Sequence, residues 1–281
     1  MSRVSLPARL AQRTTTHIPS RSYSRYNADS ILRSEFIYGT GYHGPGGDRT
    51  MEAFVTGIEK SLSPGNRVVE LGCGLGGPAN FLANKYDVKV TGIDISPDMI
   101  AECKARQASQ NANVDFVCAS MADASLFESS SVDLVWTRDA ILYLDVDLKR
   151  ETVDAVAKWL KPKAQFMIGD FGCCAPSSQP WSAGFREYVT SSAMTVIDLD
   201  TYTELIQESG KLEVTSVEDR TDAFVKYNKQ DLEAFINRRD EFEARFPGPH
   251  FEELVARWKL KIAIAEDGSF IYQRIVGHRR S

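Results

Sequence analysis

The sequence of 281 residues predicts an α/β fold: a doubly wound, mostly parallel sheet of seven strands with a helical cap. Three observations favour this architecture. Apolar segments with the length of strands alternate with helical segments, which is typical of parallel sheets with right-handed crossovers. A glycine-rich loop joins the first strand to the helix that follows it. A long charged helical segment, 221–265, separates the last two strands.

The expected elements follow one another along the chain after residue 28. Helical patterns cover 50–61, 78–86, 97–109 and 151–160, and the helix that opens at Pro97 has Ser96 as its N-cap. The expected strands are 66–74, 88–95, 114–120, 132–138, 164–171, 212–219 and 269–277. The pattern of 221–265 is that of charged amphipathic helices. We therefore expect this segment to cover the active site as a cap rather than to form a separate domain.

The N-terminus differs in composition from the rest of the chain. It holds five arginines and many Ser and Thr residues in its first 28 positions, and no acid before Asp29. This composition is typical of an organellar transit peptide, and residues 21–24 resemble a mitochondrial processing site. We therefore expect 1–23 to be a removed mitochondrial leader and 24–281 to be a single domain. The alternative is a disordered basic tail on a cytoplasmic protein.

Charge and composition exclude several kinds of partner. Without the four arginines of 1–23 the net charge falls from −5 to −9, and no basic stripe is left for nucleic acid. No apolar run approaches the roughly 18 residues of a membrane span. The five cysteines are too scattered for a disulfide framework, and none of the four histidines has a metal-ligand spacing. We expect a monomer that acts on a small molecule without a metal.

The segment VVELGCGLGGPA, 68–79, places glycines between a strand and a helix, where the backbone can turn sharply and approach a ligand. Gly72, Gly74 and Gly76 alone would also suit a dinucleotide. Two acids sharpen the prediction. Glu70, at the strand end, would repel a pyrophosphate but attract a cationic amine, and Asp94, at the end of the next strand, can accept hydrogen bonds from both hydroxyls of a ribose. The pattern favours S-adenosylmethionine, and a purely structural glycine loop is the alternative.

A second candidate site lies in WTRDAILYLD, 136–145, where the fourth strand ends on a cation and an anion. The carboxyl ends of strands in open α/β sheets border the ligand crevice, so Arg138 and Asp139 are candidate site residues. Asp139 could hold a cationic amine by Coulomb attraction. The sequence suggests that this strand turns directly into a helix that carries Tyr143 one turn later. A surface ion pair is the alternative for Arg138 and Asp139.

The ordered segments VVELGCGLGG, VTGIDIS, VDLVWTRDAILYL and WLKPKAQFMIGDF resemble the motif set of class I S-adenosylmethionine-dependent methyltransferases. Within that superfamily the chain is similar to the phosphoethanolamine N-methyltransferase group, over nearly all residues after 24. The resemblance implies the Rossmann-like methyltransferase fold and S-adenosylmethionine as cosubstrate. It also implies that 24–47 covers the cofactor.

The resemblance assigns roles to further residues. An Asp at the place of Asp139 contacts the methyl-accepting amine in this family. Beyond the glycine loop and its two acids, the implied cofactor contacts are Tyr42, Gly44, Ile95, Ser120, Met121 and Arg138. Position 143 departs from the family, which has a His there that is hydrogen-bonded to an N-terminal tyrosine matched by Tyr26. Tyr143 would keep a Tyr–Tyr hydrogen bond without the basicity of imidazole, or it is an ordinary core aromatic.

The family's phosphate-binding set is also altered. Phe171 stands in place of a tyrosine, and Ser192 and Met194 stand in place of an Arg-x-Tyr pair, so that Lys261 is the member retained. Each lost charge-assisted hydrogen bond is worth roughly 1.5–3 kcal/mol. A lone lysine accepts a carboxylate as readily as a phosphate. We therefore expect Lys261, with Phe171 and Met194 beside it, to suit a small carboxylate-bearing acceptor better than phosphoethanolamine.

The function that these residues favour is methyl transfer from S-adenosylmethionine to the nitrogen of a small amine or amino acid. The alternatives within this class are S- or O-methylation of a small carboxylic acid, such as a thioether acid, and phosphoethanolamine N-methylation. Hydride transfer on a dinucleotide is a different class, against which Glu70 argues. A catalytically silent cofactor-binding protein is disfavoured by the combination of the glycine loop, Asp94 and Asp139.

Overall fold

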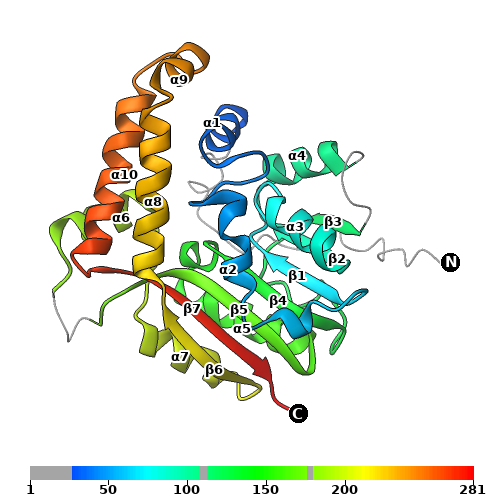
Figure 1. Cartoon of the computed structure of the whole chain (residues 1–281). Helices are drawn as coiled ribbons and strands as arrows, with labels where there is room; N and C mark the ends of the chain where they lie inside the picture. The colour runs from blue at the N-terminus through cyan, green and yellow to red at the C-terminus, as the bar shows by residue number, and fades with distance from the viewer. Residues whose placement is uncertain (1–26, 108–112, 176–179) are drawn as a thin grey trace.

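The computed structural model describes residues 27–107, 113–175 and 180–281 (Figure 1). Within them lies one seven-stranded sheet of order β3-β2-β1-β4-β5-β7-β6. The strands are β1 Arg67–Leu71, β2 Lys89–Asp94, β3 Val114–Cys118, β4 Val132–Arg138, β5 Leu160–Cys173, β6 Leu212–Asp219 and β7 Phe270–Arg279. The first five pair in parallel, while β7 runs antiparallel to both β5 and β6. This confirms the predicted fold class.

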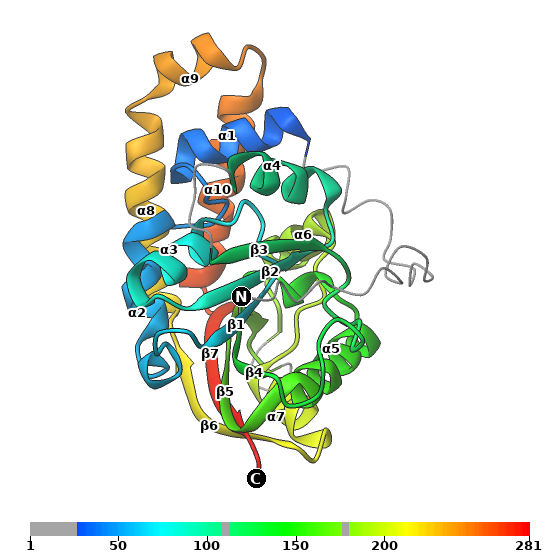
Figure 2. The ribbon, with the colours of Figure 1, turned by 90° about the vertical axis from the view of Figure 1, so that its right-hand side faces the viewer.

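Helices cover both faces of the sheet (Figures 1 and 2). One face packs against α2 Met51–Val55, α3 Gly77–Tyr86 and α4 Pro97–Gln107, and the other against α5 Val146–Trp159 and α7 Leu199–Glu208. The central strands are apolar on both sides for this reason: in β4, Trp136 is buried on the first face and Val135 on the second. Among the described residues, no helix has the length and apolarity that a bilayer crossing requires.

A helical pillar rises beyond the carboxyl ends of the parallel strands (Figure 1). It consists of α8 Thr221–Ile236, α9 Arg239–Arg245 and α10 His250–Glu266, between β6 and β7, with α6 Ala183–Ser192 beside α10. The Nε1 of Trp258 donates to Oδ1 of the fully buried Asn228 at 2.8 Å, which ties α10 to α8. The N-terminal helix α1, Ala28–Tyr38, packs Phe36 edge-on against Phe235 and Phe242. The N-terminal segment and the pillar therefore share one apolar cluster.

Two of the expected helical segments are wrong in detail. The pattern at 50–61 is broken into η2 Gly47–Thr50, α2 and η3 Glu59–Ser61, because Gly57 adopts φ +88° and its N–H turns to the Glu59 side chain at 2.7 Å. After β4 the chain does not enter a helix directly. The short 3-10 turn η4, Ile141–Tyr143, intervenes, and α5 starts at its N-cap Asp145. The expected leader 1–23 and Tyr26 lie outside the described residues.

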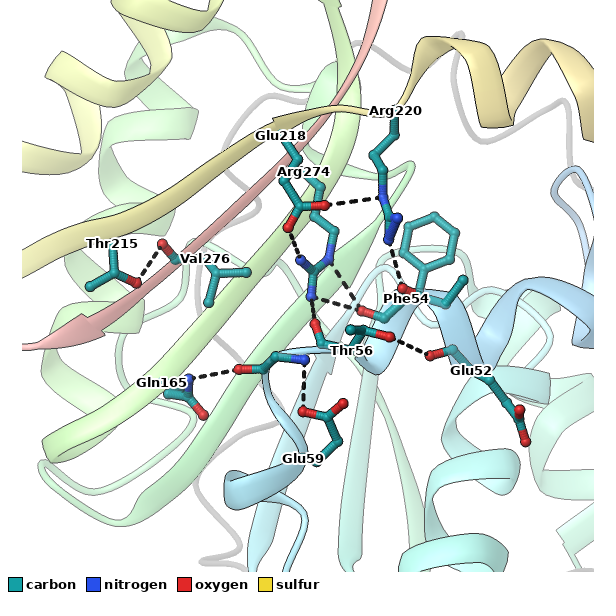
Figure 3. Close-up of polar contacts among 12 residues, drawn as sticks. Glu52, Phe54, Thr56, Glu59, Gln165, Thr215, Glu218, Arg220, Arg274 and Val276 are labelled. Carbon is teal, nitrogen blue, oxygen red and sulfur yellow. Dashed lines mark hydrogen bonds and ion pairs between the residues drawn. The ribbon is translucent and has the colours of Figure 1, made fainter.

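Arg274 of β7 and Arg220, which directly follows β6, hold the end of α2 (Figure 3). Arg274, whose side chain is 2% exposed, donates to the Phe54 carbonyl from Nε at 3.3 Å and from Nη2 at 3.2 Å, and also to the Thr56 carbonyl. Its Nη1 pairs with Glu218 at 2.7 Å. Arg220 donates to the carbonyl of the residue before Phe54 at 2.8 Å. These contacts satisfy the carbonyls that the end of a helix leaves without partners.

We expect Arg274→Met to lower the free energy of unfolding by about 2–4 kcal/mol, because buried carbonyls lose a charged donor. Arg220→Met is the matched control, since Arg220 is 29% exposed and serves a single carbonyl. Its expected loss is about 1 kcal/mol. Urea titrations of both variants measure the difference. Equal losses would show that Arg274 does not hold the helix end in the way described.

Candidate active site

The glycine loop lies where β1 and β2 end side by side. Gly72 and Gly76 have φ of +70° and +76°, and a Cβ at either position would lie 2.2 Å from Ala140 Cβ or 2.5 Å from Phe116. Both glycines are therefore required by the fold itself. Gly74, at φ +52°, is different, because a Cβ there would meet no atom within 4 Å. The loop leaves open space at Gly74, which is where a ligand can approach the backbone.

Asp94 closes the loop from β2. Its Oδ2 accepts from the Gly74 N–H and its Oδ1 from the Ser96 N–H, each at 2.9 Å. Burial raises the pKa of Asp94, and these backbone donors oppose the rise. The carboxylate is thus fixed beside the open position at Gly74, as a ribose-binding acid must be.

Glu70 lies beneath the same loop with 2% of its surface exposed. Its Oε2 is a buried oxygen for which no hydrogen-bond donor exists among the described residues. Burial raises the pKa of Glu70 well above its usual range, Arg138 lowers it, and the Ala79 amide lowers it further. An acceptor oxygen without a donor costs free energy unless a donor arrives with a ligand.

The remaining predicted cofactor residues lie around this loop. Ile95 follows β2, Ser120 and Met121 follow β3, and the Met121 side chain approaches Gly72. The expected cofactor-covering segment docks on the loop, since the Gly77 N–H donates to the Gly41 carbonyl at 2.9 Å. Tyr42 of that segment packs against the same region, and burial raises its pKa to about 12.

Arg138 links the end of β4 to the covering segment. Its side chain is 8% exposed, donates to the Pro45 carbonyl at 2.6 Å and to Thr50 Oγ1 at 3.0 Å, and lies 4.6 Å from the Phe54 ring centre. A Cβ on Gly44 would come within 3.4 Å of its Nη2. A contact of Arg138 with the cofactor stays a prediction. The structure shows that Arg138 holds the segment that covers the loop.

Asp139 occupies a strained backbone position, with φ +57°. Its Oδ1 accepts from the Tyr272 hydroxyl at 2.8 Å, while its Oδ2 lies 3.6 Å from Arg138 Nε. The same Oδ2 is 3.2 Å from where a Cβ on Gly44 would stand. Burial raises the pKa of Asp139, and Arg138 and Tyr272 oppose that rise. The carboxylate is therefore oriented by one phenol and keeps Oδ2 beside the covering segment.

Lys261 comes from α10, and 9% of it is exposed. Its Nζ lies 5.4 Å from the Trp258 ring centre and 5.7 Å from that of Phe224. Burial lowers the pKa of Lys261 to about 8, while Asp139 and Asp231 raise it. The effect of Asp139 on this pKa shows that Lys261 and Asp139 lie in the same part of the site. No carboxylate of the described chain forms an ion pair with Lys261.

The other predicted acceptor residues lie on the pillar side of Asp139. Phe171 is 7% exposed and belongs to an aromatic cluster with Phe224 and Tyr272, so it is mainly a core residue. Met194 and Tyr143 are half-buried against the same cluster. Tyr143 is near enough to Tyr188 of α6 to raise the pKa of that phenol.

Sequence reasoning missed two residues. Tyr272, the partner of Asp139, carries no local signal, because it lies 133 positions away and is brought close only by the antiparallel pairing of β5 with β7. The sequence could have indicated Arg257, because it precedes Lys261 by four residues and a residue at that spacing shares a helix face with the lysine. Arg257 is also one of the groups that lower the pKa of Lys261. Lys261 thus has a second cation near it, and the preference for a carboxylate over a phosphate stays a prediction.

Residues 68–163 match a family model described as a methyltransferase domain. Together with the sheet order, the glycine loop and the two acids around it, this match confirms the predicted fold of the class I S-adenosylmethionine-dependent methyltransferases. Within the class, the chain is similar to phosphoethanolamine N-methyltransferases.

The similarity covers most of this chain but only part of some relatives. Phosphoethanolamine N-methyltransferase 1 of Arabidopsis thaliana is 32% identical over 85% of this chain and 47% of its own length. The enzyme of Plasmodium falciparum is 28% identical over 85% of this chain and 87% of its own length. Phosphoethanolamine N-methyltransferase 2 of Haemonchus contortus, solved with phosphomonomethylethanolamine and S-adenosylhomocysteine, superposes with a TM-score of 0.84 at 24% identity, over 92% of this chain and 59% of that one. The chain thus spans about half the length of the plant relative.

S-adenosylmethionine, the cosubstrate that the class implies, fits the residues present. Glu70 Oε2 is a buried acceptor that a cationic amine can satisfy, and Gly74 faces open space beside the Asp94 carboxylate. Glu70 would hold the amino group, Asp94 the ribose hydroxyls, and the covering segment with Tyr42 would exclude water.

We expect Asp94→Ala to weaken S-adenosylmethionine binding at least tenfold, because the ribose loses a charged acceptor and the Gly74 amide loses its partner. Asp98→Ala is the matched control, since Asp98 is exposed in the first turn of α4. Isothermal titration calorimetry of both variants measures the change. Unchanged affinity in Asp94→Ala would contradict its assignment to the ribose.

Proposed function

We propose that the protein transfers a methyl group from S-adenosylmethionine to the nitrogen of a small amine that also carries an acidic group. The proposal rests on two opposite charges that face the same site, the carboxylate of Asp139 and the ammonium of Lys261. Asp139 lies at the end of β4 next to the covering segment, and Lys261 approaches from α10. An acceptor with an amine at one end and an acid at the other matches both.

Asp139 would bind the amine end. S-adenosylmethionine supplies an electrophilic methyl group on a sulfonium, so the acceptor nitrogen gains a C–N bond and loses a proton, while the sulfur keeps the electron pair of the broken bond. Burial raises the pKa of Asp139, which makes the carboxylate a stronger hydrogen-bond acceptor for an N–H. The Tyr272 hydroxyl donates to Asp139 at 2.8 Å and so fixes the orientation of the carboxylate. The carboxylate can then hold the nitrogen lone pair of the acceptor in line with the sulfur–methyl bond.

Lys261 would bind the acidic end. Its ammonium is buried 5.7 Å from the Phe224 ring centre and 5.4 Å from that of Trp258, where the low local dielectric strengthens attraction to an anion. Similarity to phosphoethanolamine N-methyltransferases supports an amine acceptor with an acid group, although this chain spans about half of the plant relative.

The proposal is tested with the whole chain, labelled S-adenosylmethionine and four acceptors: phosphoethanolamine, β-alanine, ethanolamine and 3-mercaptopropionate. We expect N-methylated product from at least one of the two amines that carry an acid, at a higher kcat/KM than from ethanolamine. Product from 3-mercaptopropionate alone would replace the proposal with S-methylation. No product from any amine would refute it.

We expect Asp139→Asn to lower kcat at least 100-fold, because an amide cannot attract the amine or take up its proton. Affinity for S-adenosylmethionine should change less than threefold, since the ribose and amino contacts are on other strands. Tyr272→Phe is the companion variant, with a smaller loss of about tenfold in kcat, because the carboxylate stays but loses its orienting donor. Single-turnover rates separate chemistry from binding. A loss confined to cofactor affinity would contradict the role of Asp139.

The lowered pKa of Lys261 predicts a pH effect. The lysine is charged below pH about 8 and neutral above it, so its attraction for an anion is present at lower pH and is lost as pH rises through about 8. We expect the inhibition constant of propionate, which has no amine and stays ionised, to rise by up to roughly tenfold per pH unit above that point. Lys261→Arg should keep its charge and show a flat profile. The same rise in both proteins would exclude Lys261 as its origin.

A further inference from the structure

We infer that Arg257 is a second acceptor-binding residue, which joins Lys261 in one two-cation subsite for the oxyanion of the acceptor. This inference rests on the proposed function, because it assumes an acceptor that carries an acid. The assignment concerns this chain's own residues, since the resemblance places the family's arginine at position 192, where this sequence has a serine.

Arg257 and Lys261 share one face of α10, one turn apart, and that face meets α6. The Arg257 guanidinium lies 4.7 Å from the Tyr188 ring centre. It donates through Nη1 to Ser191 Oγ at 3.3 Å and through Nη2 to Ser192 Oγ. Arg257 is exposed, but its Nη2 reaches the fully buried Ser192, so one edge of the guanidinium lies between α10 and α6. Figure 1 shows α6 beside the lower part of α10.

No acid of the described chain forms an ion pair with Arg257 or Lys261, although Asp139 and Asp231 lie near enough to raise the pKa of Lys261. The recorded partners of Arg257 are two neutral hydroxyls and one ring, and Lys261 has two rings. Two cations one helical turn apart repel each other, which is unfavourable without a counter-charge. Neighbouring arginines of the pillar differ: Arg238 pairs with Glu241 at 2.8 Å, and Arg239 pairs with Glu243 at 3.0 Å. An oxyanion between Arg257 and Lys261 would supply a counter-charge in direct contact with both cations.

Tyr188 connects this pair to the reacting end of the site. Burial raises the pKa of its phenol, Arg257 opposes the rise, and Tyr143 and Asp139 add to it. Tyr188 is therefore close enough to respond to Arg257 and to Asp139 alike. The guanidinium has five N–H donors in a planar fork, and the two serines occupy two of them. The remaining donors can bind a carboxylate or a phosphate together with the Lys261 ammonium.

A purely structural tie between α6 and α10 is the competing explanation for Arg257. It predicts that loss of the guanidinium lowers stability or kcat for every acceptor alike. An anion subsite instead predicts a loss that depends on the charge of the acceptor, which separates the two explanations in one set of measurements.

The test compares Arg257→Gln with Lys259→Gln in the chain of residues 1–281. Lys259 is an exposed cation on the same helix, so its variant removes the same charge from the other face. We expect Arg257→Gln to raise KM at least tenfold for phosphoethanolamine or β-alanine, whichever the wild type uses, and less than twofold for ethanolamine. Lys259→Gln should leave all three unchanged, and Arg257→Lys should recover part of the loss. A larger effect on phosphoethanolamine than on β-alanine would indicate a phosphate; the reverse would indicate a carboxylate.

Equal losses for charged and neutral acceptors, or no loss at all, would overturn the inference. If the wild type methylates no amine, the proposed function fails, and the subsite is then tested by binding alone. Titration of the wild type with inorganic phosphate and with acetate should show binding of at least one anion, weakened at least fivefold in Arg257→Gln and unchanged in Lys259→Gln. Equal anion binding by the wild type and Arg257→Gln, or no binding by either, would refute the subsite independently of any activity.

Discussion

The Arg138 side chain is the contact on which the arrangement of the site depends. It starts at the end of β4, donates to the Pro45 carbonyl and to Thr50, and stacks on Phe54. One buried cation thereby fixes the covering segment above the glycine loop and lies 3.6 Å from the carboxylate of Asp139. A guanidinium can do this because its fork serves several acceptors in one plane. The Arg274 contacts hold the end of α2, the helix that follows this segment and carries Phe54 (Figure 3).

The acids of the site lie at one end and its cations at the other, and this asymmetry favours one orientation of a bound acceptor. Glu70, Asp94 and Asp139 stand at the carboxyl ends of parallel strands, where burial raises the pKa of each. The cations Arg257 and Lys261 stand on α10, outside the sheet. Such a gradient orients a zwitterionic acceptor with its amine toward the strand ends and its acid toward the pillar. The doubly wound sheet thus supplies the acids, and the insertion between β6 and β7 supplies the cations.

The sequence predicted elements well where the signal was local. Alternating apolar segments located every strand, and Pro97 after Ser96 located the start of α4. Prediction failed where a single residue interrupted a periodic pattern, as Gly57 does between α2 and η3. It also failed after β4, because Asp139 at φ +57° sends the chain into a 3-10 turn before α5 can begin. Neither backbone angle can be read from hydrophobic periodicity.

The sequence by itself determined the fold class, the glycine loop and Asp94, because each depends on neighbouring residues or on strand order alone. The tertiary structure alone decided the partners of the site residues. Tyr272 reaches Asp139 through the pairing of β7 with β5, and Arg257 reaches Ser192 through the packing of α10 on α6. The physical reason is that a side-chain contact between distant segments depends on register and packing angle, and neither quantity is encoded in the spacing of residues along one segment.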